Sequence, residues 1–317
     1  MASCSHVRDS VRQIDNTTWL IGTSHVLRLE QGPGNSGSLW ENSSDGSSYD
    51  LSRAPEPLPN ARPIPDNSHV RQIHDAGDAS AVFAFGDALI LKIRLATHGT
   101  RQEPETLALL AGKTLSFDIP KVLFYAEEAG KTYLLEPLIP GKRLDDIWWD
   151  MTEDQKEGVV TRISQVCSEL RAFQSDSLTV LDDGWLEPFQ EKRSSEVQAL
   201  QKHCESLGMD CSVFFLSHND LGPTNILVTE TETEIAILDW ELAGFSPLEW
   251  VRTKFAVCGA LDMENQQKAK NVSHGPGYRV RIEQRLGDLG FPEATEAYKA
   301  MRTERYEEWK KPRPWLQ

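Results

Sequence analysis

The sequence predicts an α+β fold in which a small set of antiparallel strands comes first and a larger, mainly helical part follows. Between residues 11 and 136, short apolar runs alternate with turns that contain glycine, asparagine or aspartate, as in strand meanders. From residue 152 onward, apolar residues recur at the spacing of a helix face. The chain has 317 residues, which is ample for a sizeable core.

The charge balance limits the partners of this chain. It has 48 acidic and 33 basic residues, a formal net charge of −15 and a pI near 5.0. Binding of nucleic acid through a basic surface is therefore not expected. The excess acid fits a cationic second substrate, and a solvated acidic surface that aids solubility explains it equally well.

Cysteine usage and hydropathy indicate a soluble cytoplasmic protein. The five cysteines include no C-x-x-C pair and no cluster with metal-ligand spacing, so neither zinc nor a disulfide framework is expected. The N-terminus lacks an apolar signal core, and no apolar run approaches the roughly 18–20 residues of a membrane span. The sequence does not indicate an oligomeric state.

A short motif occurs twice near the N-terminus. Residues 11–30 and 70–94 both begin with VRQI, followed by polar turn residues, a strand, a glycine turn and a second strand. This predicts a small internal repeat of a strand meander, with convergence of two hairpin-like segments as the alternative. The first copy has Arg28 where the second has Lys92, and we expect no catalytic role for that arginine.

The segment between the two copies has the composition of a linker. Residues 31–60 are rich in glycine, serine, asparagine and proline, which is typical of a flexible loop. We therefore expect residues 1–65 to be an N-terminal extension with a short strand meander and a flexible linker.

The second copy contains a candidate nucleotide-binding lysine. Lys92 lies in the second of two strands predicted at residues 80–85 and 88–94, one strand after a glycine turn, where a phosphate-contacting lysine belongs. A lysine in a strand is more often an exposed edge residue. The turn before Ser80 is not a G-x-G-x-x-G loop, but its small residues offer backbone N–H groups to a nucleotide.

A helix is predicted to follow at residues 102–110, with proline in its first turn. Glu105, or Glu103 as the alternative, is expected to reach back and pair with Lys92. Acidic residues are also favoured at a helix N-terminus by the dipole alone.

Two further strands, at residues 119–125 and 131–136, are predicted to complete this sheet. The segment 136–141 would then be a hinge whose backbone groups, including those of Glu136 and Leu138, read the adenine edge. Helices are predicted in the remaining chain at residues 144–149, 152–173, 194–207, from 246 onward and at 292–310. A turn-rich insert at 181–192 is either an ordinary loop or a border of the acceptor site.

The stretch from 217 to 240 contains His218, Asp220, Asn225 and, after a short apolar strand, Asp239. One carboxylate can accept a hydroxyl proton, and two oxygen ligands can hold Mg²⁺, which is the set that phosphoryl transfer from ATP needs. The alternative is that Asp220 and Asn225 only cap turns.

These residues, with Lys92, Glu105 and the LLEPLIPG hinge, resemble the aminoglycoside phosphotransferase and choline kinase-like family. The segments FFLSHNDLGPTNI, ILDWELAG and PLEWVRTKF are similar to its fungal members, and the resemblance covers residues 70–261. It implies a protein-kinase-like fold with an N-lobe at 66–138, a C-lobe at 139–317 and ATP in the cleft between them.

By the same resemblance, Asp220 is the catalytic base and Asn225 and Asp239 hold Mg²⁺. His218 braces the loop, Lys92 contacts the α- and β-phosphates, and Glu105 fixes Lys92. The sequence departs from the pattern at Asn219, where many members have a small residue, and at Trp240 and Glu241, where protein kinases have phenylalanine and glycine.

The predicted function is ATP-dependent transfer of the γ-phosphate to the hydroxyl of a small molecule. A pseudokinase or a nucleotide- or metabolite-binding module of the same fold is the alternative. The reasons are that the chain lacks a Gly-rich loop and that its metal loop, the segment Asp239-Trp240-Glu241, is a variant of the protein-kinase pattern. A protein kinase is disfavoured by the absence of an A-P-E segment and of a long activation loop. The sequence does not identify the acceptor.

Overall fold

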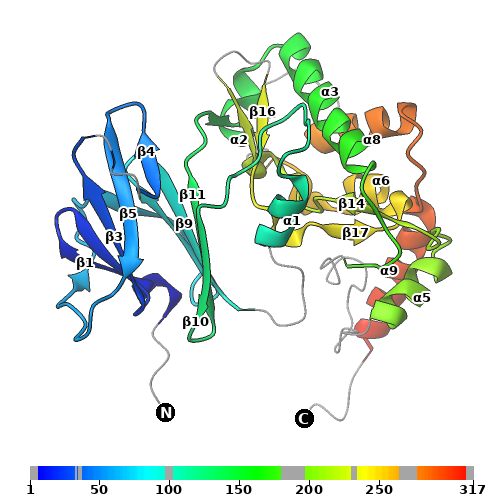
Figure 1. Ribbon diagram of the computed structural model, residues 1–317. Helices are drawn as coiled ribbons and strands as arrows, with labels where there is room; N and C mark the ends of the chain where they lie inside the picture. The colour runs from blue at the N-terminus through cyan, green and yellow to red at the C-terminus, as the bar shows by residue number, and fades with distance from the viewer. Residues whose placement is uncertain are drawn as a thin grey trace. The chain divides into compact units, whose positions relative to one another are not determined.

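The chain divides into two compact units, one built mainly of strands and one mainly of helices (Figure 1). The computed structural model describes residues 6–32, 34, 38–96, 103–179, 197–229, 234–263 and 277–311. Unit 1 comprises Met1–Gly99 and Pro120–Ile139, and unit 2 comprises Thr100–Ile119 and Pro140–Gln317. The α+β prediction is confirmed, and helix α1 (Glu103–Leu110) groups with unit 2. The insert predicted at 181–192 lies outside the described residues.

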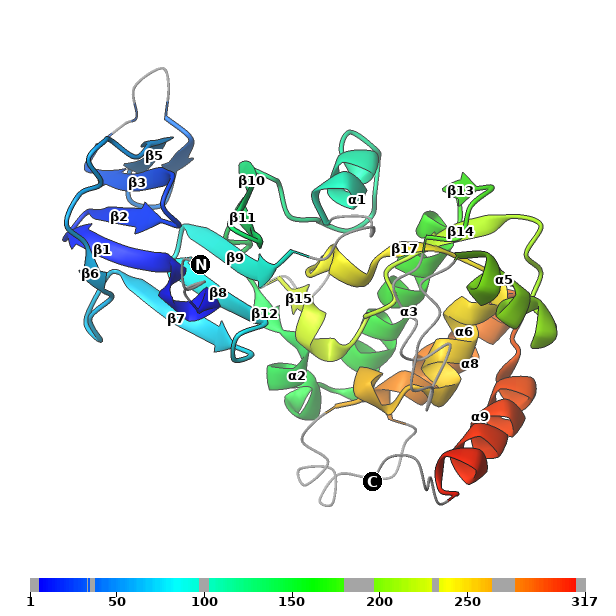
Figure 2. The same ribbon diagram turned by 90° about the horizontal axis from the view of Figure 1, so that it is seen from below.

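Unit 1 contains two antiparallel sheets. The first has the strand order β4-β5-β3-β2-β1-β6, most of which can be followed in Figure 2, and the second has the order β10-β11-β9-β8-β7. The first sheet consists of β1 (Val11–Asp15), β2 (Thr18–Ile21), β3 (His25–Glu30), β4 (Trp40–Asn42), β5 (Ser47–Arg53) and β6 (Arg62–Pro63). The second consists of β7 (Val70–Asp75), β8 (Ser80–Phe85), β9 (Leu89–Leu95), β10 (Phe124–Glu128) and β11 (Lys131–Pro137).

The predicted internal repeat is confirmed by strand register. Val11 pairs with Ile21 in the first copy and Val70 with Phe85 in the second, and β1 and β7 each have a register shift after their third residue. In each copy the second strand is followed directly by a glycine, which is Gly22 with φ of +61° in the first copy and Gly86 with φ of +55° in the second. Each glycine donates its N–H to the carbonyl of the residue that precedes the first strand. Positive φ explains why glycine occupies this turn position twice.

The repeat extends over five strands, well beyond the short motif. The order β4-β5-β3-β2-β1 in the first sheet matches β10-β11-β9-β8-β7 in the second. Leu27 pairs with Trp19 and Leu51, and its counterpart Leu91 pairs with Phe83 and Leu135. The register therefore makes Arg28 the counterpart of Lys92.

The two sheets share one hydrophobic core. Equivalent positions point into it from both copies, namely Val11 and Val70, Trp19 and Phe83, Ile21 and Phe85, Leu27 and Leu91, and Tyr49 and Tyr133. Polar contacts also join the sheets, because the Tyr49 hydroxyl lies 2.7 Å from His69 Nε2 and donates to the Phe85 carbonyl at 3.2 Å. The N-terminal residues are therefore an integral part of unit 1.

The expectation of a flexible linker over residues 31–60 is wrong for residues 40–53, which form β4 and β5. The turn at residues 43–46 and the serines of β5 itself obscure a strand in which Tyr49 is buried and Leu51 packs against the core. Composition averaged over the segment hid this strand.

The other predicted strands of unit 1 are confirmed, with one change of boundary. The strand expected at residues 119–125 begins only at Phe124. Pro120 has no N–H to donate to a sheet. Just before it, Asp118 instead forms a parallel bridge to Ala236 within unit 2.

The described residues of unit 2 form helices and two small sheets, with orders β12-β15-β16 and β13-β14-β17. Its longest helix, α3 (Glu153–Leu170), begins with the predicted capping box, in which Thr152 Oγ1 accepts from Gln155 N and Gln155 Oε1 accepts from Thr152 N. The other α-helices in the described part of unit 2 are α2 (Leu144–Ile147), α5 (Val197–Ser206), α6 (Leu248–Val257), α8 (Tyr278–Asp288) and α9 (Thr295–Trp309). Helix α8 was not predicted. The remaining strands are β12 (Lys142–Arg143), β13 (Gln174–Ser175), β14 (Phe214–Ser217), β15 (Ile226–Val228), β16 (Ile235–Ile237) and β17 (Gly244–Ser246).

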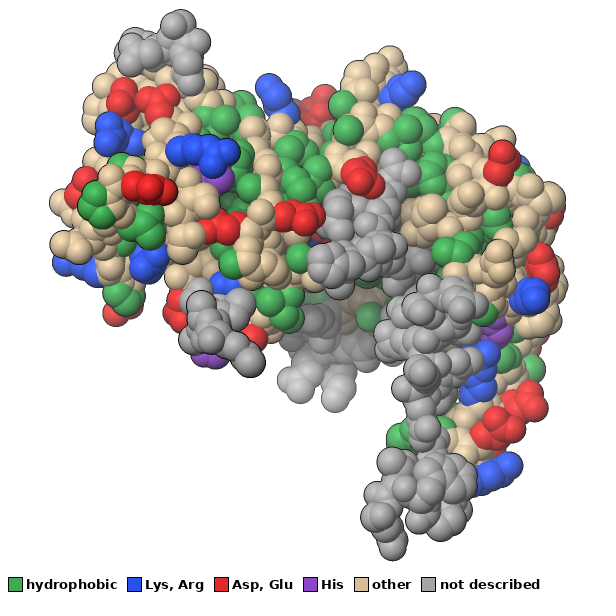
Figure 3. Space-filling view, turned by 60° about the horizontal axis from the view of Figure 1, so that its bottom comes forward, with side chains coloured by type: hydrophobic (Ala, Val, Ile, Leu, Met, Phe, Trp, Pro, Cys, Tyr) green, Lys and Arg blue, Asp and Glu red, His purple; other side chains and the backbone are tan. Residues whose placement is uncertain are grey.

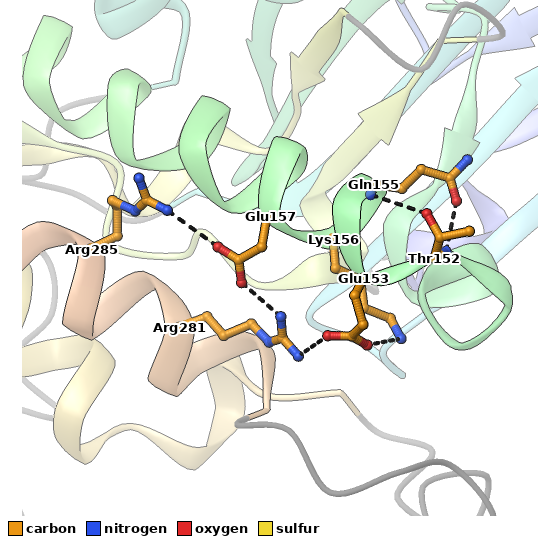
Figure 4. A network of polar contacts seen from close by, with 7 residues as sticks. All are labelled: Thr152, Glu153, Gln155, Lys156, Glu157, Arg281 and Arg285. Atoms are coloured by element: carbon orange, nitrogen blue, oxygen red, sulfur yellow. Dashed lines mark hydrogen bonds and ion pairs between the residues drawn. The ribbon is translucent and has the colours of Figure 1, made fainter.

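A network of charged side chains joins α8 to the first turns of α3 (Figure 4). Arg281 donates to Glu153 and to Glu157 at 2.7 Å each, and Arg285 donates to Glu157 at 3.2 Å. The hydrogen bond from Arg281 holds the pKa of Glu153 below its usual value. The Arg281 side chain is 9% exposed, whereas its carboxylate partners lie at the surface, so we expect each pair to contribute little to stability.

Acidic and basic side chains are interspersed on the face drawn in Figure 3. None of the helices in the described part of the chain combines the length and the hydropathy needed to cross a bilayer.

Candidate active site

The residues of the predicted catalytic loop lie between short strands of unit 2. Strand β14 ends at Ser217, and the one-turn 3-10 helix η3 (Pro223–Asn225) leads into β15. Strands β15 and β16 form a hairpin in which Leu238 N donates to the Asn225 carbonyl at 2.8 Å. The hairpin therefore places Asn225 and Asp239 at the same end.

Asn225 holds Asp220 by two hydrogen bonds. Its amide Nδ2 donates to the Asp220 carboxylate Oδ2 at 2.8 Å and to the Asp220 carbonyl at 2.9 Å. Both side chains are half-buried. The pairing sets the direction of the Asp220 carboxylate, and it leaves the amide oxygen of Asn225 as an acceptor.

His218 links the loop of Asp220 to the segment that carries Asp239. Its Nδ1 accepts from Asp220 N at 3.2 Å, so its Nε2 carries the hydrogen that is donated to the Leu238 carbonyl at 2.9 Å. Burial lowers the pKa of His218 to about 4, although the nearby carboxylates of Asp220 and Asp239 act in the opposite direction. The imidazole is therefore neutral at physiological pH and acts as a brace between the two segments.

Asn219 has a left-handed backbone conformation, with φ of +64°. Asparagine tolerates this region better than most residues. Its amide Nδ2 donates to the carbonyls of Leu242 at 3.0 Å and Ser217 at 3.3 Å. The departure from a small residue at this position is thus explained by hydrogen bonds that fasten the loop.

Two residues that were not singled out in the sequence also fasten this loop. Lys254 of α6 is 4% exposed and donates from Nζ to the Asn219 carbonyl. Tyr278 of α8 is fully buried and donates its hydroxyl to the Leu221 carbonyl at 2.7 Å. The sequence contains one signal for Lys254. This lysine lies one helical turn after Trp250 on an otherwise apolar helix face, where a lysine is expected to be buried only if it has a partner.

The metal loop is held from α1. Asp239 has φ of +60°, and the next backbone N–H, that of Trp240, donates to Glu103 Oε1 at 3.0 Å. The Trp240 ring is fully buried, stacks on Phe117 with centroids 6.2 Å apart, and meets His218 edge-on at 4.6 Å. Tryptophan at this position therefore packs the loop against its neighbours.

Glu103 and Glu105 have different environments on α1. Glu103 is 7% exposed and contacts the metal loop, whereas Glu105 is exposed. Of the two glutamates, the buried one is thus Glu103, which was the alternative in the sequence.

The oxygen donors at this end of the hairpin fit Mg²⁺. They are the carboxylate of Asp239 and the amide oxygen of Asn225, whose amide nitrogen is engaged by Asp220. Mg²⁺ is usually bound through one or two carboxylates, with waters and substrate phosphates completing its shell. Among the described residues there is no group of three or more His, Cys, Asp or Glu side chains arranged for a metal.

In unit 1, Lys92 is paired with a carboxylate of the neighbouring strand. Its Nζ lies 3.1 Å from Glu136 Oε2, and the two side chains are 11% and 3% exposed. Lys92 is therefore not the exposed edge lysine that was the alternative. Ser80, the first residue of β8, closes the preceding turn by accepting from Ala76 N at 3.0 Å.

The predicted hinge has few backbone donors. Leu138 N donates to the Ala88 carbonyl at 2.8 Å, so this N–H is engaged within unit 1. Pro137 and Pro140 have no N–H. Two residues, Leu138 and Ile139, lie between these prolines, and the N–H of Ile139 takes no part in the contact with Ala88.

Comparison with known proteins identifies the family of this chain. The sequence model of the phosphotransferase enzyme family (APH) matches residues 69–250, which is more than half of the chain. None of the curated proteins matches. Among solved structures, the GDP complex of wild-type aminoglycoside 2'-phosphotransferase-IIIa has a TM-score of 0.51 and 16% identity, with 76% of this chain and 84% of that chain covered.

The ADP-bound aminoglycoside phosphotransferase APH(2'')-Ib has a TM-score of 0.48 and 15% identity, with 78% of this chain and 88% of that chain covered. The likeness to 2'-phosphotransferase-IIIa supports the fold, and the match over residues 69–250 shows the family. The chain belongs to the phosphotransferase enzyme family (APH), whose protein-kinase-like fold it shares.

Proposed function

We propose that the protein is an ATP-dependent small-molecule kinase of the cytoplasm that transfers the γ-phosphate to an acceptor hydroxyl. The observation that carries the proposal is the loop in which Asn225 orients the Asp220 carboxylate at 2.8 Å while a neutral His218 joins this loop to the strand end before Asp239. A binding module has no need for a carboxylate held in this way.

Asp220 is the proposed base. The hydrogen bond from Asn225 occupies Oδ2, which leaves Oδ1 to accept the proton of the acceptor hydroxyl. His218 is unsuited to this role, because its Nδ1 already accepts from Asp220 N and burial disfavours the protonated imidazole that a base would form. The backbone bonds from Tyr278 and Lys254 hold the loop in place during the reaction.

Mg²⁺ would be held by Asn225 and Asp239, and when bound it would neutralise the charge of the ATP phosphates. Glu103 supports this role, since it fixes the backbone directly after Asp239. We therefore assign to Glu103 the support of the segment that carries Asp239, a role distinct from the pairing with Lys92 that was expected of Glu105.

Residues of unit 1 would bind the nucleotide. Lys92 would contact the α- and β-phosphates, and the turn before Ser80 would lie over them. In the hinge, the Ile139 N–H and the carbonyls of Glu136 and Leu138 would read the adenine edge. The acceptor is a small molecule with a hydroxyl group, and the net charge of −15 fits a cationic one.

Two substitutions test the roles separately. Asp220→Asn should reduce turnover by 10²-fold or more with Mg·ATP affinity retained, because general base catalysis typically contributes 10²–10⁴-fold. Asp239→Asn should instead lose Mg²⁺-dependent ATP binding. Calorimetry with Mg·ATP and coupled ADP detection over a panel of amino alcohols, sugars and nucleosides measure both. Wild-type protein that binds Mg·ATP and phosphorylates no compound of a broad panel would favour the pseudokinase alternative.

A further inference from the structure

One carboxylate that pairs with Lys92 comes from its own sheet. Glu136 on β11 and Lys92 on β9 belong to neighbouring strands of unit 1, and Glu136 pairs in register with Ile90, two residues before the lysine. Residues two apart on a strand point to the same face, so both side chains lie on one face of the sheet. Their charged atoms are 3.1 Å apart, and both side chains are largely shielded from water.

The internal repeat shows that the sheet itself does not require this pair. In the first copy the counterparts are Arg28, which is exposed, and Ser52, which pairs in register with Val26 and is also exposed. The apolar core positions are kept in both copies, from Leu27 and Leu91 to Tyr49 and Tyr133. The two copies thus share their packing and differ at the ion pair.

A buried ion pair that packing does not require carries a free-energy penalty, because both charges lose their hydration. It is retained in the copy that carries the nucleotide lysine. The carboxylate of Glu136 restricts Nζ to one place on the face of the sheet, where a free lysine side chain would sample many.

We propose that the Glu136 side chain is a positioning residue that holds Lys92 Nζ in place for the nucleotide phosphates. The inference rests on the proposed function, in which Lys92 contacts the phosphates of ATP. It gives Glu136 a side-chain role in addition to its backbone role in the hinge.

Binding of Mg·ATP and of adenosine to the full-length protein, measured by calorimetry, tests this. Glu136→Gln should weaken Mg·ATP binding about tenfold, as expected for loss of a charge-assisted hydrogen bond. Binding of adenosine, which has no phosphates, should be unchanged. Glu136→Asp, which keeps the charge, should retain part of the affinity for Mg·ATP. Arg28→Met, at the equivalent place in the first copy, should alter neither.

Melting temperatures without nucleotide give a second readout. Lys92→Met should lower the Tm because it leaves a buried carboxylate without its cation, and adding Glu136→Gln should recover part of the loss. Equal loss of ATP and adenosine affinity in Glu136→Gln, or additive Tm shifts, would overturn the positioning role. Wild-type protein that binds no Mg·ATP would overturn the proposed function, whereas tight wild-type binding that Glu136→Gln leaves intact would overturn this inference alone.

Discussion

The buried histidine of the catalytic loop should make the stability of unit 2 depend on pH. The pKa of His218 is lowered from 6.5 to about 4, chiefly by burial. Between these two values the unfolded chain binds a proton that the folded protein does not bind. The free energy of unfolding is therefore fully available above pH 6.5 and is lost as the pH falls toward 4.

The size of the effect follows from the two pKa values. Each unit of difference corresponds to about 1.4 kcal/mol, so lowering the pH from 7 to 5 should remove about 2 kcal/mol of stability through His218 alone. His218→Gln has no group that titrates in this range. Its unfolding free energy should be lower than that of wild type at pH 7, and it should fall by about 2 kcal/mol less on going to pH 5.

Urea unfolding of both proteins at pH 7, 6 and 5, followed by circular dichroism, measures this difference. His74→Gln, at an exposed histidine of unit 1, controls for loss of an imidazole as such. A direct check is the NMR titration of the His218 ring, which should remain neutral down to pH 5. Parallel pH dependences in wild type and His218→Gln, or a ring that titrates near 6.5, would refute the reasoning.

Two further predictions follow from the contacts on either side of the site. Glu103→Ala should lower turnover at least tenfold, because it removes the oxygen that accepts the Trp240 N–H. The matched Glu105→Ala, at an exposed position of the same helix, should be near wild type; equal effects of the two in steady-state ADP release would contradict this. Leu27→Ala and Leu91→Ala, at equivalent and fully buried positions of the two sheets, should each destabilise unit 1 by about 2–5 kcal/mol in chemical denaturation; a neutral Leu27→Ala would mean that the first sheet is not part of the core.

Much of unit 1 could be predicted because strand signals are local. The alternation around Lys92 and the repeated VRQI motif indicated the right strands and the right correspondence between Arg28 and Lys92. The extent of the repeat could not be predicted, since β5 and β11 share only a few apolar positions, and their similarity is visible only in strand order and register. The strands of residues 40–53 were missed because turn residues dominate their composition.

In unit 2, the short spacing from His218 to Asn225 and the apolar strand before Asp239 predicted that these residues lie close together, and the hydrogen bonds of His218 and Asn225 agree with this. The contact of Glu103 with the metal loop depends on which side of α1 faces that loop, and a helix of eight residues with two acidic residues in its first turn does not reveal this. The hydrogen bonds from Lys254 of α6 and Tyr278 of α8 to the loop join segments that are distant in the sequence, so no local sequence pattern predicts them.

The central claim is that this chain moves phosphate from ATP to a small alcohol with Asp220 as base. The most direct test is mass spectrometry of a panel of amino alcohols, sugars and nucleosides after incubation with ATP, Mg²⁺ and either wild-type protein or Asp220→Asn. The account predicts that wild type adds one phosphoryl group to at least one hydroxyl compound, and that Asp220→Asn, folded and still binding Mg·ATP, forms that product at least 10²-fold more slowly. Product formation by Asp220→Asn at the wild-type rate would contradict it.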